Sequence, residues 1–127
     1  LVPAVIRWQT PLTHMRRTTT KEVKVSGVTI PAGAKVVMWY LSGNRDEQAI
    51  ENPDQFTVDR KNPRHHLSFG FGIHRCVGNR LAEMQIRVLW EEILARNLTF
   101  EPAGEAQRTL SNAIRGITTL PLRVIRP

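Results

Sequence analysis

The chain has one cysteine in 127 residues, and its 11 acidic side chains are outnumbered by 18 lysines and arginines. A single cysteine excludes an internal disulfide framework and suits a reducing compartment. No apolar run approaches the length of a membrane-spanning helix, and no basic-then-apolar leader opens the sequence. We therefore expect a cytoplasmic protein without a transmembrane segment.

An initiator methionine is also absent. The sequence opens in mid-pattern with LVPAVIRWQTP, which suggests a piece of a longer protein. Its 127 residues, 41% of them apolar, are enough for one modest domain with a limited core. We find no repeat, low-complexity tract or interdomain linker, so residues 1–127 are treated as one unit.

The positive charge is large and unevenly placed. A formal net charge of +7 indicates acidic partners, such as nucleic acid, an anionic surface or an acidic protein. From Arg60 to Ala82 there are five Lys or Arg residues and no Asp or Glu, and this basic stretch contains the cysteine. No basic stripe with interleaved aromatics, helix-turn-helix or zinc finger accompanies it, so we do not expect nucleic-acid binding.

Turn signals in the first third predict a helix followed by hairpins. Residues 1–10 have the pattern of a helix that stops before Pro11, because a residue that precedes proline is pushed out of the helical region. Alternating β-branched residues flank Ser26-Gly27, which indicates a hairpin. A second turn at residues 31–33 is predicted to lead into a strand at residues 35–40.

The remainder is predicted to be an irregular stretch, a long helix and short strands. Residues 42–66 have weak periodicity, with one short helix near Asp46 to Ile50, and long connections of this kind tend to be functional. Apolar residues at helical spacing then predict a helix from Asn79 to Arg96. The apolar stripe is Leu81, Met84, Val88 and Leu89. The tail is predicted to form a strand at 98–100, a hairpin turning at Arg115-Gly116, and a strand in LPLRVI.

The stretch FGFGIHRCVG, Phe69 to Gly78, holds three of the eight glycines and the only cysteine. A cysteine thiolate that acts as a ligand or nucleophile needs its charge stabilised. Cys76 comes just before the predicted helix, where free N–H groups and the positive end of the helix dipole point back at it. Gly78 should permit a tight turn there. Gly70 and Gly72 should let the backbone lie flat against a large group.

Three uses of such a thiolate are open from these residues alone. A nucleophile would need a base, for which His74 is a candidate. A zinc site could draw on His65, His66, His74 and Cys76, although their spacing matches no common structural pattern. The third use is axial ligation of haem iron.

The stretch resembles the haem-binding signature of the cytochrome P450 family, F-x-x-G-x-[RH]-x-C-x-G. Phe69, Gly72, His74, Cys76 and Gly78 fill its five fixed positions. Three further stretches fall in the family's order, namely P-x-x-x-x-R from Pro11 to Arg16, P-D-Q-F-x-x-x-R from Pro53 to Arg60, and GNRLAEMQ. The resemblance covers the whole chain and implies an α+β fold, the C-terminal haem-binding portion of a P450. Its expected order is short helix, β-hairpins, irregular meander, Cys-ligand loop, long helix and C-terminal β-hairpin.

The resemblance implies a haem b cofactor and a role for each matching residue. Cys76 would be the fifth iron ligand, and Phe69 would shield it from water. His74 and Arg16 match positions that bind the haem propionates, for which cationic donors are suited. The other positions that would border the cofactor are Gly70, Gly72, Gly78 and Ala82. The family's acid–threonine pair lies on a distal helix outside this sequence, so no catalytic residue is expected here.

One position departs from the family pattern. Arg7 and Arg60 match the two arginines of a structural Glu-Arg-Arg triad, but Ala4 stands where the glutamate is expected. Without a carboxylate, two like charges would share a semi-buried place, which is unfavourable. Either another acid substitutes for the missing glutamate, or the gene is damaged or truncated.

A narrower resemblance is to the bacterial P450 branch that hydroxylates the terminal methyl of medium-chain alkanes. It rests on RWQTPLTHMRRT, VVMWYLSGNRDE, NPDQF-x-x-DRK, HRC-x-GNRLAE and LWEEIL. It implies insertion of one oxygen atom of O2 into an unactivated C–H bond of a small apolar substrate. The residues expected to line the substrate pocket are Leu12, Met15, Ala113 and Ile114, which could equally be core.

Such an enzyme would receive electrons from a ferredoxin, itself supplied by a ferredoxin reductase. The resemblance places the basic docking face for that acidic partner at Arg64, Arg75 and Arg80, with His65 and His66 beside them. An alternative is a non-catalytic truncated fragment that binds no haem, which Ala4 and the missing distal helix favour. In either case, apolar surface that would face the rest of a P450 should be exposed.

Overall fold

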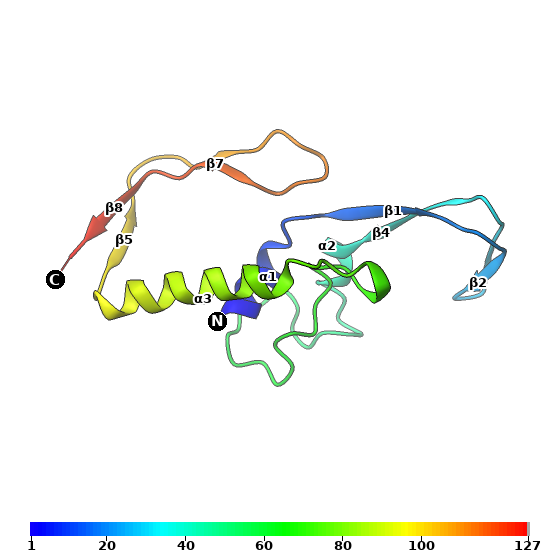
Figure 1. Ribbon diagram of the computed structural model, residues 1–127, viewed down its shortest axis with the longest axis horizontal. Coiled ribbons are helices and arrows are strands. Elements are labelled where there is room, and N and C mark those ends of the chain that lie inside the picture. The colour runs from blue at the N-terminus through cyan, green and yellow to red at the C-terminus, as the bar shows by residue number, and fades with distance from the viewer. Residues whose placement is uncertain (127) are drawn as a thin grey trace.

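A computed structural model describes residues 1–126 and contains the mixture of helices and strands that the sequence predicts. Figure 1 shows an extended arrangement in which helix α3 runs lengthwise, with two-stranded ribbons toward both ends. The elements, in chain order, are α1 (Val2–Gln9), β1 (His14–Thr18), β2 (Val23–Val25), β3 (Val28–Ile30), β4 (Lys35–Trp39), α2 (Tyr40–Gly43), the 3-10 turn η1 (Gly72–His74), α3 (Asn79–Ala95), β5 (Thr99–Pro102), β6 (Gln107–Arg108), β7 (Ile117–Thr119) and β8 (Leu122–Ile125).

Helix α1, the β2–β3 hairpin and strand β4 follow the sequence prediction, whereas strand β1 was not predicted. Helix α1 ends before Pro11, and its cap Thr10 has a left-handed φ of 40° while its N–H bonds to Ile6 O. Strands β2 and β3 pair across Ser26 and Gly27, which have φ values of 48° and 84°. Two successive positive φ values are the requirement of the tight hairpin turn that the sequence indicated. Strands β1 and β4 form a longer antiparallel ribbon.

The short helix predicted at Asp46 to Ile50 is wrong. These residues form a single turn, in which Asp46 O accepts from Ile50 N at 2.8 Å and Asp46 Oδ1 accepts from Gln48 N at 2.9 Å. Asn52 then has a left-handed φ of 45° and Pro53 follows, so the helix cannot propagate. The short helix of this region is instead α2, directly after β4.

The C-terminal ribbon forms, but its turn is not at Arg115-Gly116. Strand β5 pairs with β8 and β6 with β7, and the chain bends near Asn112 and Ala113. Arg115 N donates to Pro11 O at 2.8 Å, and Thr13 N donates to Ala113 O at 2.9 Å. These long-range bonds hold residues 113–115 extended against the segment between α1 and β1, so the turn falls before them.

Helix α3 has the predicted extent within one residue, but its apolar stripe is exposed. Leu81, Met84, Val88 and Leu89 are all exposed, whereas Glu83 is the buried residue of the helix. This matches the expectation that apolar surface would be left uncovered. No helix within residues 1–126 has both the length and the apolar character needed to cross a membrane.

The centre of the molecule is a polar network with little apolar core around it. Among residues 1–126, the buried apolar side chains are Ala4, Ile6, Tyr40, Ile50 and Pro53. Asn44 is fully buried and donates from Nδ2 to Thr10 Oγ1 (2.8 Å) and Ser68 Oγ (2.9 Å), while its Oδ1 accepts from Leu67 N (2.6 Å). The Ser68 hydroxyl donates onward to Ile6 O at 2.9 Å. Asn44 therefore joins α1, the end of α2 and the segment that leads to the cysteine.

We predict that Asn44→Ala strongly destabilises the chain. It deletes two buried and one part-buried side-chain hydrogen bonds and leaves the Leu67 N–H without its acceptor, which costs roughly 3 kcal/mol. The urea midpoint followed by circular dichroism should fall accordingly. Asn62→Ala, at an exposed position, is the matched control and should leave the midpoint nearly unchanged. Equal midpoints for the two variants would contradict the central role of Asn44.

His66 is buried within the same region, and its burial is the main cause that lowers its pKa to about 4 from 6.5, with the nearby Arg75 charge adding to the effect. Its Nδ1 accepts from Ser68 N at 3.3 Å, and its Nε2 is buried with no hydrogen-bond partner. The neutral imidazole is therefore the form that the fold accommodates.

We predict that stability falls as pH drops from 7 to 5. The unfolded chain protonates His66 near pH 6.5 whereas the folded chain does so only near pH 4, so the unfolded state binds more protons in this window. The loss should be roughly 2 kcal/mol at pH 5, measured as the free energy of unfolding in urea. His66→Gln should flatten this dependence, and His65→Gln, at an exposed position, should not. An equal pH dependence in wild type and His66→Gln would exclude this origin.

Candidate functional site

The cysteine lies in a loop shaped by two glycines. Gly70 and Gly72 have φ values of +72° and +76°, a region that other L-residues rarely adopt. A Cβ on Gly70 would also lie 3.2 Å from the Tyr40 hydroxyl oxygen. Cys76 N donates to Phe69 O at 2.9 Å and closes the loop, leaving the Cys76 side chain exposed.

Gly78 does not have the conformational role that the sequence suggested. It is the N-cap of α3 with a φ of −82°, which any residue can adopt. A Cβ there would lie 3.8 Å from Cys76 Sγ, an ordinary contact. The tight turning of the loop is therefore due to Gly70 and Gly72. Ala82 lies one turn into α3, where its N–H bonds to Gly78 O at 3.0 Å.

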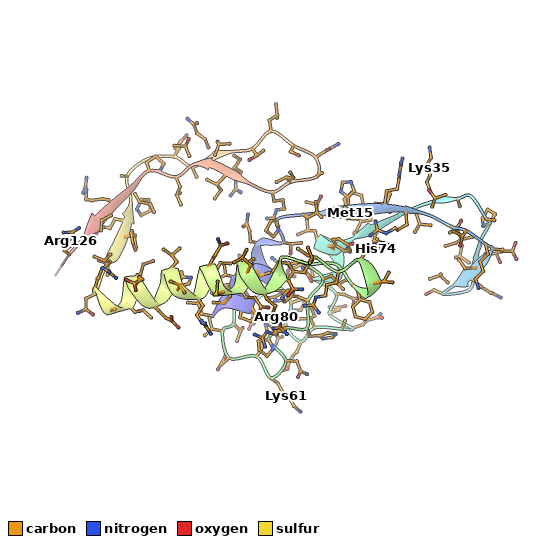
Figure 2. The ribbon with its side chains drawn as sticks, in the orientation of Figure 1. Met15, Lys35, Lys61, His74, Arg80 and Arg126 are labelled. Atoms are coloured by element: carbon orange, nitrogen blue, oxygen red, sulfur yellow. The ribbon has the colours of Figure 1, made fainter. Side chains whose placement is uncertain are left out.

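The loop borders a pocket of about 300 Å³. Six residues that the sequence singled out line it, namely Leu12, Met15, Phe69, Gly70, His74 and Cys76. Three others were not predicted, namely Arg17, Tyr40 and Ser68. Figure 2 shows Met15 on β1 above His74 in the cysteine loop. The pocket thus combines one thiol and an apolar wall with two basic side chains.

Arg17 lines this pocket, whereas Arg16, the position given by the resemblance, is exposed on the same strand. Successive side chains of a strand point to opposite faces, so Arg17 shares its face with Met15. Strand alternation counted from Met15 is the signal that could have identified Arg17.

The residues expected to form an apolar wall come from two distant segments. Leu12 and Ile114 form an antiparallel β-bridge. Thr13 Oγ1 donates to Ala113 O at 3.0 Å, across 100 positions of sequence. Met15 and Ile114 are exposed, and Leu12 and Ala113 are half-buried. None of the four is buried among residues 1–126, and of the four only Leu12 and Met15 line the pocket.

Arg7 and Arg60 hold the irregular segment through backbone carbonyls. Arg7 is 1% exposed and donates to Asn44 O (2.9 Å), Pro53 O (2.8 Å) and Gln55 O (3.1 Å). Arg60 donates to Glu51 O, to Asn52 O at 2.7 Å and to the same Gln55 O at 2.8 Å. Both guanidinium groups therefore converge on residues 51–55.

No acidic side chain takes the place of the glutamate expected at position 4. Within residues 1–126, neither Arg7 nor Arg60 forms a salt bridge. Burial lowers the pKa of Arg7, and the nearby positive charges of Arg60 and Arg45 lower it further. The Asp54 carboxylate pairs with Arg45 at 3.3 Å. Backbone carbonyl oxygens accept hydrogen bonds from both guanidinium groups, but they carry no net charge to neutralise the two cations.

Two of the three predicted docking arginines have an acidic partner. Glu83 accepts from Arg64 at 3.0 Å and from Arg80 at 3.4 Å, while both arginine side chains stay exposed. Glu83 lies outside the apolar stripe of α3, and its burial beneath these two cations is what the sequence did not indicate. Arg75 is exposed and lies directly before Cys76.

The two other uses of the cysteine gain no geometric support. Within the part of the chain that the structure describes, no three His, Cys, Asp or Glu side chains gather as a metal site requires. His66 is buried while His65 is exposed, so these neighbours do not act together. The hydrogen bonds formed within residues 1–126 include none between Cys76 and a histidine base.

Known proteins similar in sequence to this chain include a monooxygenase and an omega-hydroxylase. The chain is 43% identical over 116 residues to linalool 8-monooxygenase from Pseudomonas putida, covering 91% of this chain and 28% of that protein. It is 41% identical over 122 residues to a methyl-branched lipid omega-hydroxylase from Mycobacterium bovis, covering 95% and 28%. It therefore spans less than a third of the length of these relatives.

Among solved structures, cytochrome P450-153 from Novosphingobium aromaticivorans superposes with a TM-score of 0.90 at 49% identity, covering 98% of this chain and 32% of that one. The family model described as Cytochrome P450 matches residues 5–125. The matched span contains the glycine loop, Cys76 and both arms of the Leu12–Ile114 bridge. The chain belongs to the cytochrome P450 family.

Proposed function

We propose that residues 1–127 are the C-terminal haem-binding portion of a haem-thiolate monooxygenase. The observation that carries the proposal is the position of Cys76, whose thiol lies at a pocket with an apolar wall, in a loop bent by Gly70 and Gly72. A P450 monooxygenase needs this combination, because the thiolate donates electron density to the metal and favours O–O cleavage.

The residues at the pocket fit haem b, a flat apolar macrocycle with two carboxylates. Phe69, Leu12 and Met15 supply apolar contact, and Cys76 supplies a thiolate ligand. His74 and Arg17 lie at the same pocket and suit the propionates, with Arg16 adjacent on β1. When bound, the haem supplies reductive activation of O2.

The protein's own contribution is ligation, electrostatics and exclusion of water. Cys76 precedes α3, whose N-terminal N–H groups and dipole favour negative charge on the sulfur. The Phe69 carbonyl accepts the Cys76 N–H, and both residues line the same pocket, where the Phe69 ring would shield the thiolate from water. Gly70 and Gly72 allow close backbone approach to the macrocycle, and Gly78 and Ala82 border it from the start of α3.

The proposed substrate is a medium-chain alkane or a similar apolar molecule, hydroxylated at its terminal methyl. Leu12 and Met15 line the pocket, and Ile114 is bridged to Leu12 with Ala113 directly before it, so these apolar side chains suit a hydrocarbon that cannot hydrogen-bond. The names of two relatives, an omega-hydroxylase and a monooxygenase of linalool, support hydroxylation of an apolar chain.

We propose an acidic ferredoxin, served by a ferredoxin reductase, as the electron donor in the cytoplasm. Arg75 lies next to Cys76, and the exposed side chains of Arg64 and Arg80 surround the start of α3. Exposed cations near the thiolate would steer an acidic protein to this face. Glu83 reduces the net charge of the pair, so Arg75 is the strongest candidate of the three.

A truncated fragment that binds no haem is the second candidate. Its support is the exposure of Phe71, Ile73 and Val77 in the cysteine loop, together with only five buried apolar side chains among the described residues. A surface of this kind normally has a covering partner. Haem binding by the isolated chain separates the two candidates.

We predict that the 127-residue chain binds haemin with a thiolate-type spectrum. After reduction, carbon monoxide should give the red-shifted Soret band that a cysteinate ligand produces, and Cys76→Ser should abolish it. Affinity should fall at least roughly tenfold in this variant, since loss of even an outer partner has that effect at metal sites. Val77→Ser, next to the ligand, is the control. A spectrum unchanged by Cys76→Ser would refute ligation by sulfur.

Activity is testable in a chimera, where this chain replaces the matching C-terminal third of cytochrome P450-153 from Novosphingobium aromaticivorans. We predict that, with a ferredoxin and its reductase, the chimera converts n-octane to a terminal alcohol, measured by gas chromatography. Ile114→Lys should reduce turnover at least about tenfold, because a charge is buried against hydrocarbon. Leu110→Lys, at a fully exposed neighbour, should not. A folded, haem-loaded chimera without octane turnover would contradict the substrate proposal.

A further inference from the structure

The short helix α2 contacts the segment that leads into the cysteine loop at both of its ends. Asn44, directly after α2, accepts from Leu67 N at 2.6 Å and donates to Ser68 Oγ at 2.9 Å. Tyr40, the first residue of α2, lies against Gly70. Both ends of α2 therefore support the approach to the cysteine.

The Tyr40 side chain is buried, and no protein hydrogen bond accounts for its position. Tyr40 is 6% exposed and lines the same pocket as Cys76. A buried tyrosine hydroxyl usually has a hydrogen-bond partner. The side-chain hydroxyl groups that donate hydrogen bonds within residues 1–126 do not include that of Tyr40. The ring is therefore held by packing, and its oxygen is directed at Gly70.

Tyr40 limits the space at one of the two strained glycines of the cysteine loop. A Cβ on Gly70 would lie 3.2 Å from the Tyr40 hydroxyl oxygen and 3.6 Å from Cζ of the same ring. Gly72 has nearly the same φ, +76° against +72°, but a Cβ there would meet nothing within 4 Å. Gly70 is buried and Gly72 is exposed. Tyr40 therefore confines Gly70 and leaves Gly72 free.

The position of Gly70 is linked to the cysteine by one hydrogen bond. Phe69, directly before Gly70, accepts the Cys76 N–H at 2.9 Å. Hydrogen bonds need short distances and near-linear geometry, so a shift of the peptide between Phe69 and Gly70 also moves Cys76 or breaks the bond. A contact that confines Gly70 therefore confines the cysteine.

We propose that Tyr40 is a positioning residue for the cysteine ligand. Its ring and hydroxyl restrict Gly70 and hold the loop in the conformation that presents Cys76 to the pocket. This purpose rests on the proposed haem-thiolate function, whereas the contact itself is tested without haem. Groups that orient a metal ligand commonly change metal affinity by roughly tenfold or more. Tyr40 was not among the site residues that the sequence predicted.

The first test measures hydrogen exchange by NMR in the haem-free 127-residue chain. Tyr40→Leu should raise the exchange rate of the Cys76 amide at least roughly tenfold, because the ring that confines Gly70 is lost. The Thr19 amide, which donates to Ala34 O at 3.0 Å at the far end of the β1–β4 ribbon, is the reference and should change little. An equal rise at both amides, or no rise at Cys76, would overturn the proposal.

The second test keeps the aromatic ring and uses the two glycines as a matched pair. Gly70→Ala should weaken haemin binding and lower the urea midpoint more than Gly72→Ala, since both strain a positive φ but only the first new Cβ meets Tyr40. Tyr40→Phe removes the oxygen that this Cβ would meet, so it should partly restore Gly70→Ala. It should not restore Gly72→Ala.

The expected recovery of haemin affinity in Gly70→Ala is more than about twofold, beyond the usual error of additivity. No recovery, or an equal recovery of both glycine variants, would overturn the proposal. A chain that binds no haemin but shows the recovery in its urea midpoint would refute the haem proposal and still support the restraint of Gly70 by Tyr40. The two failures are therefore distinguishable.

Discussion

The fold depends on hydrogen bonding of buried polar groups at the junction of α1, α2 and the cysteine loop. Asn44 contacts Thr10, Leu67 and Ser68, while its own carbonyl accepts from Arg7. Ser68 adjoins Phe69, whose carbonyl accepts the Cys76 N–H. Three hydrogen bonds, Thr10–Asn44, Asn44–Ser68 and Phe69–Cys76, thus link the end of α1 to the residue that carries the sulfur. Hydrogen bonds are directional, so this network fixes the relative orientation of α1, α2 and the cysteine loop more strictly than the few buried apolar side chains could.

Local patterns were sufficient for elements whose geometry is decided by neighbouring residues. Ser26-Gly27 has the positive φ pair of a hairpin turn, Pro11 ends α1, and helical periodicity gave α3 within one residue. The cysteine loop was identified by a motif in which glycines meet a backbone requirement and the cysteine meets a ligand requirement. Each of these signals depends only on residues a few positions apart, so a single sequence is enough to detect it.

Tertiary partners decided the features that the sequence did not predict. Asn44 is an ordinary loop residue by its neighbours, and it is buried only because Thr10 and Ser68 meet it across the fold. Glu83 has a polar-face position, yet Arg64 arrives from the irregular segment and covers it. Arg115-Gly116 has turn composition, but Pro11 binds Arg115 and keeps it extended. Pairings over such separations leave no local pattern to detect.

The bridge between Leu12 and Ile114 has a consequence for how the molecule is made. A ribosome delivers Leu12 long before Ile114, and closing a loop of this length carries an entropic cost before any contact compensates it. The bridge between Leu12 and Ile114 can therefore form only after Ile114 has left the ribosome. Until then the apolar Leu12 lacks this partner in the nascent chain, and uncovered apolar surface of this kind favours aggregation.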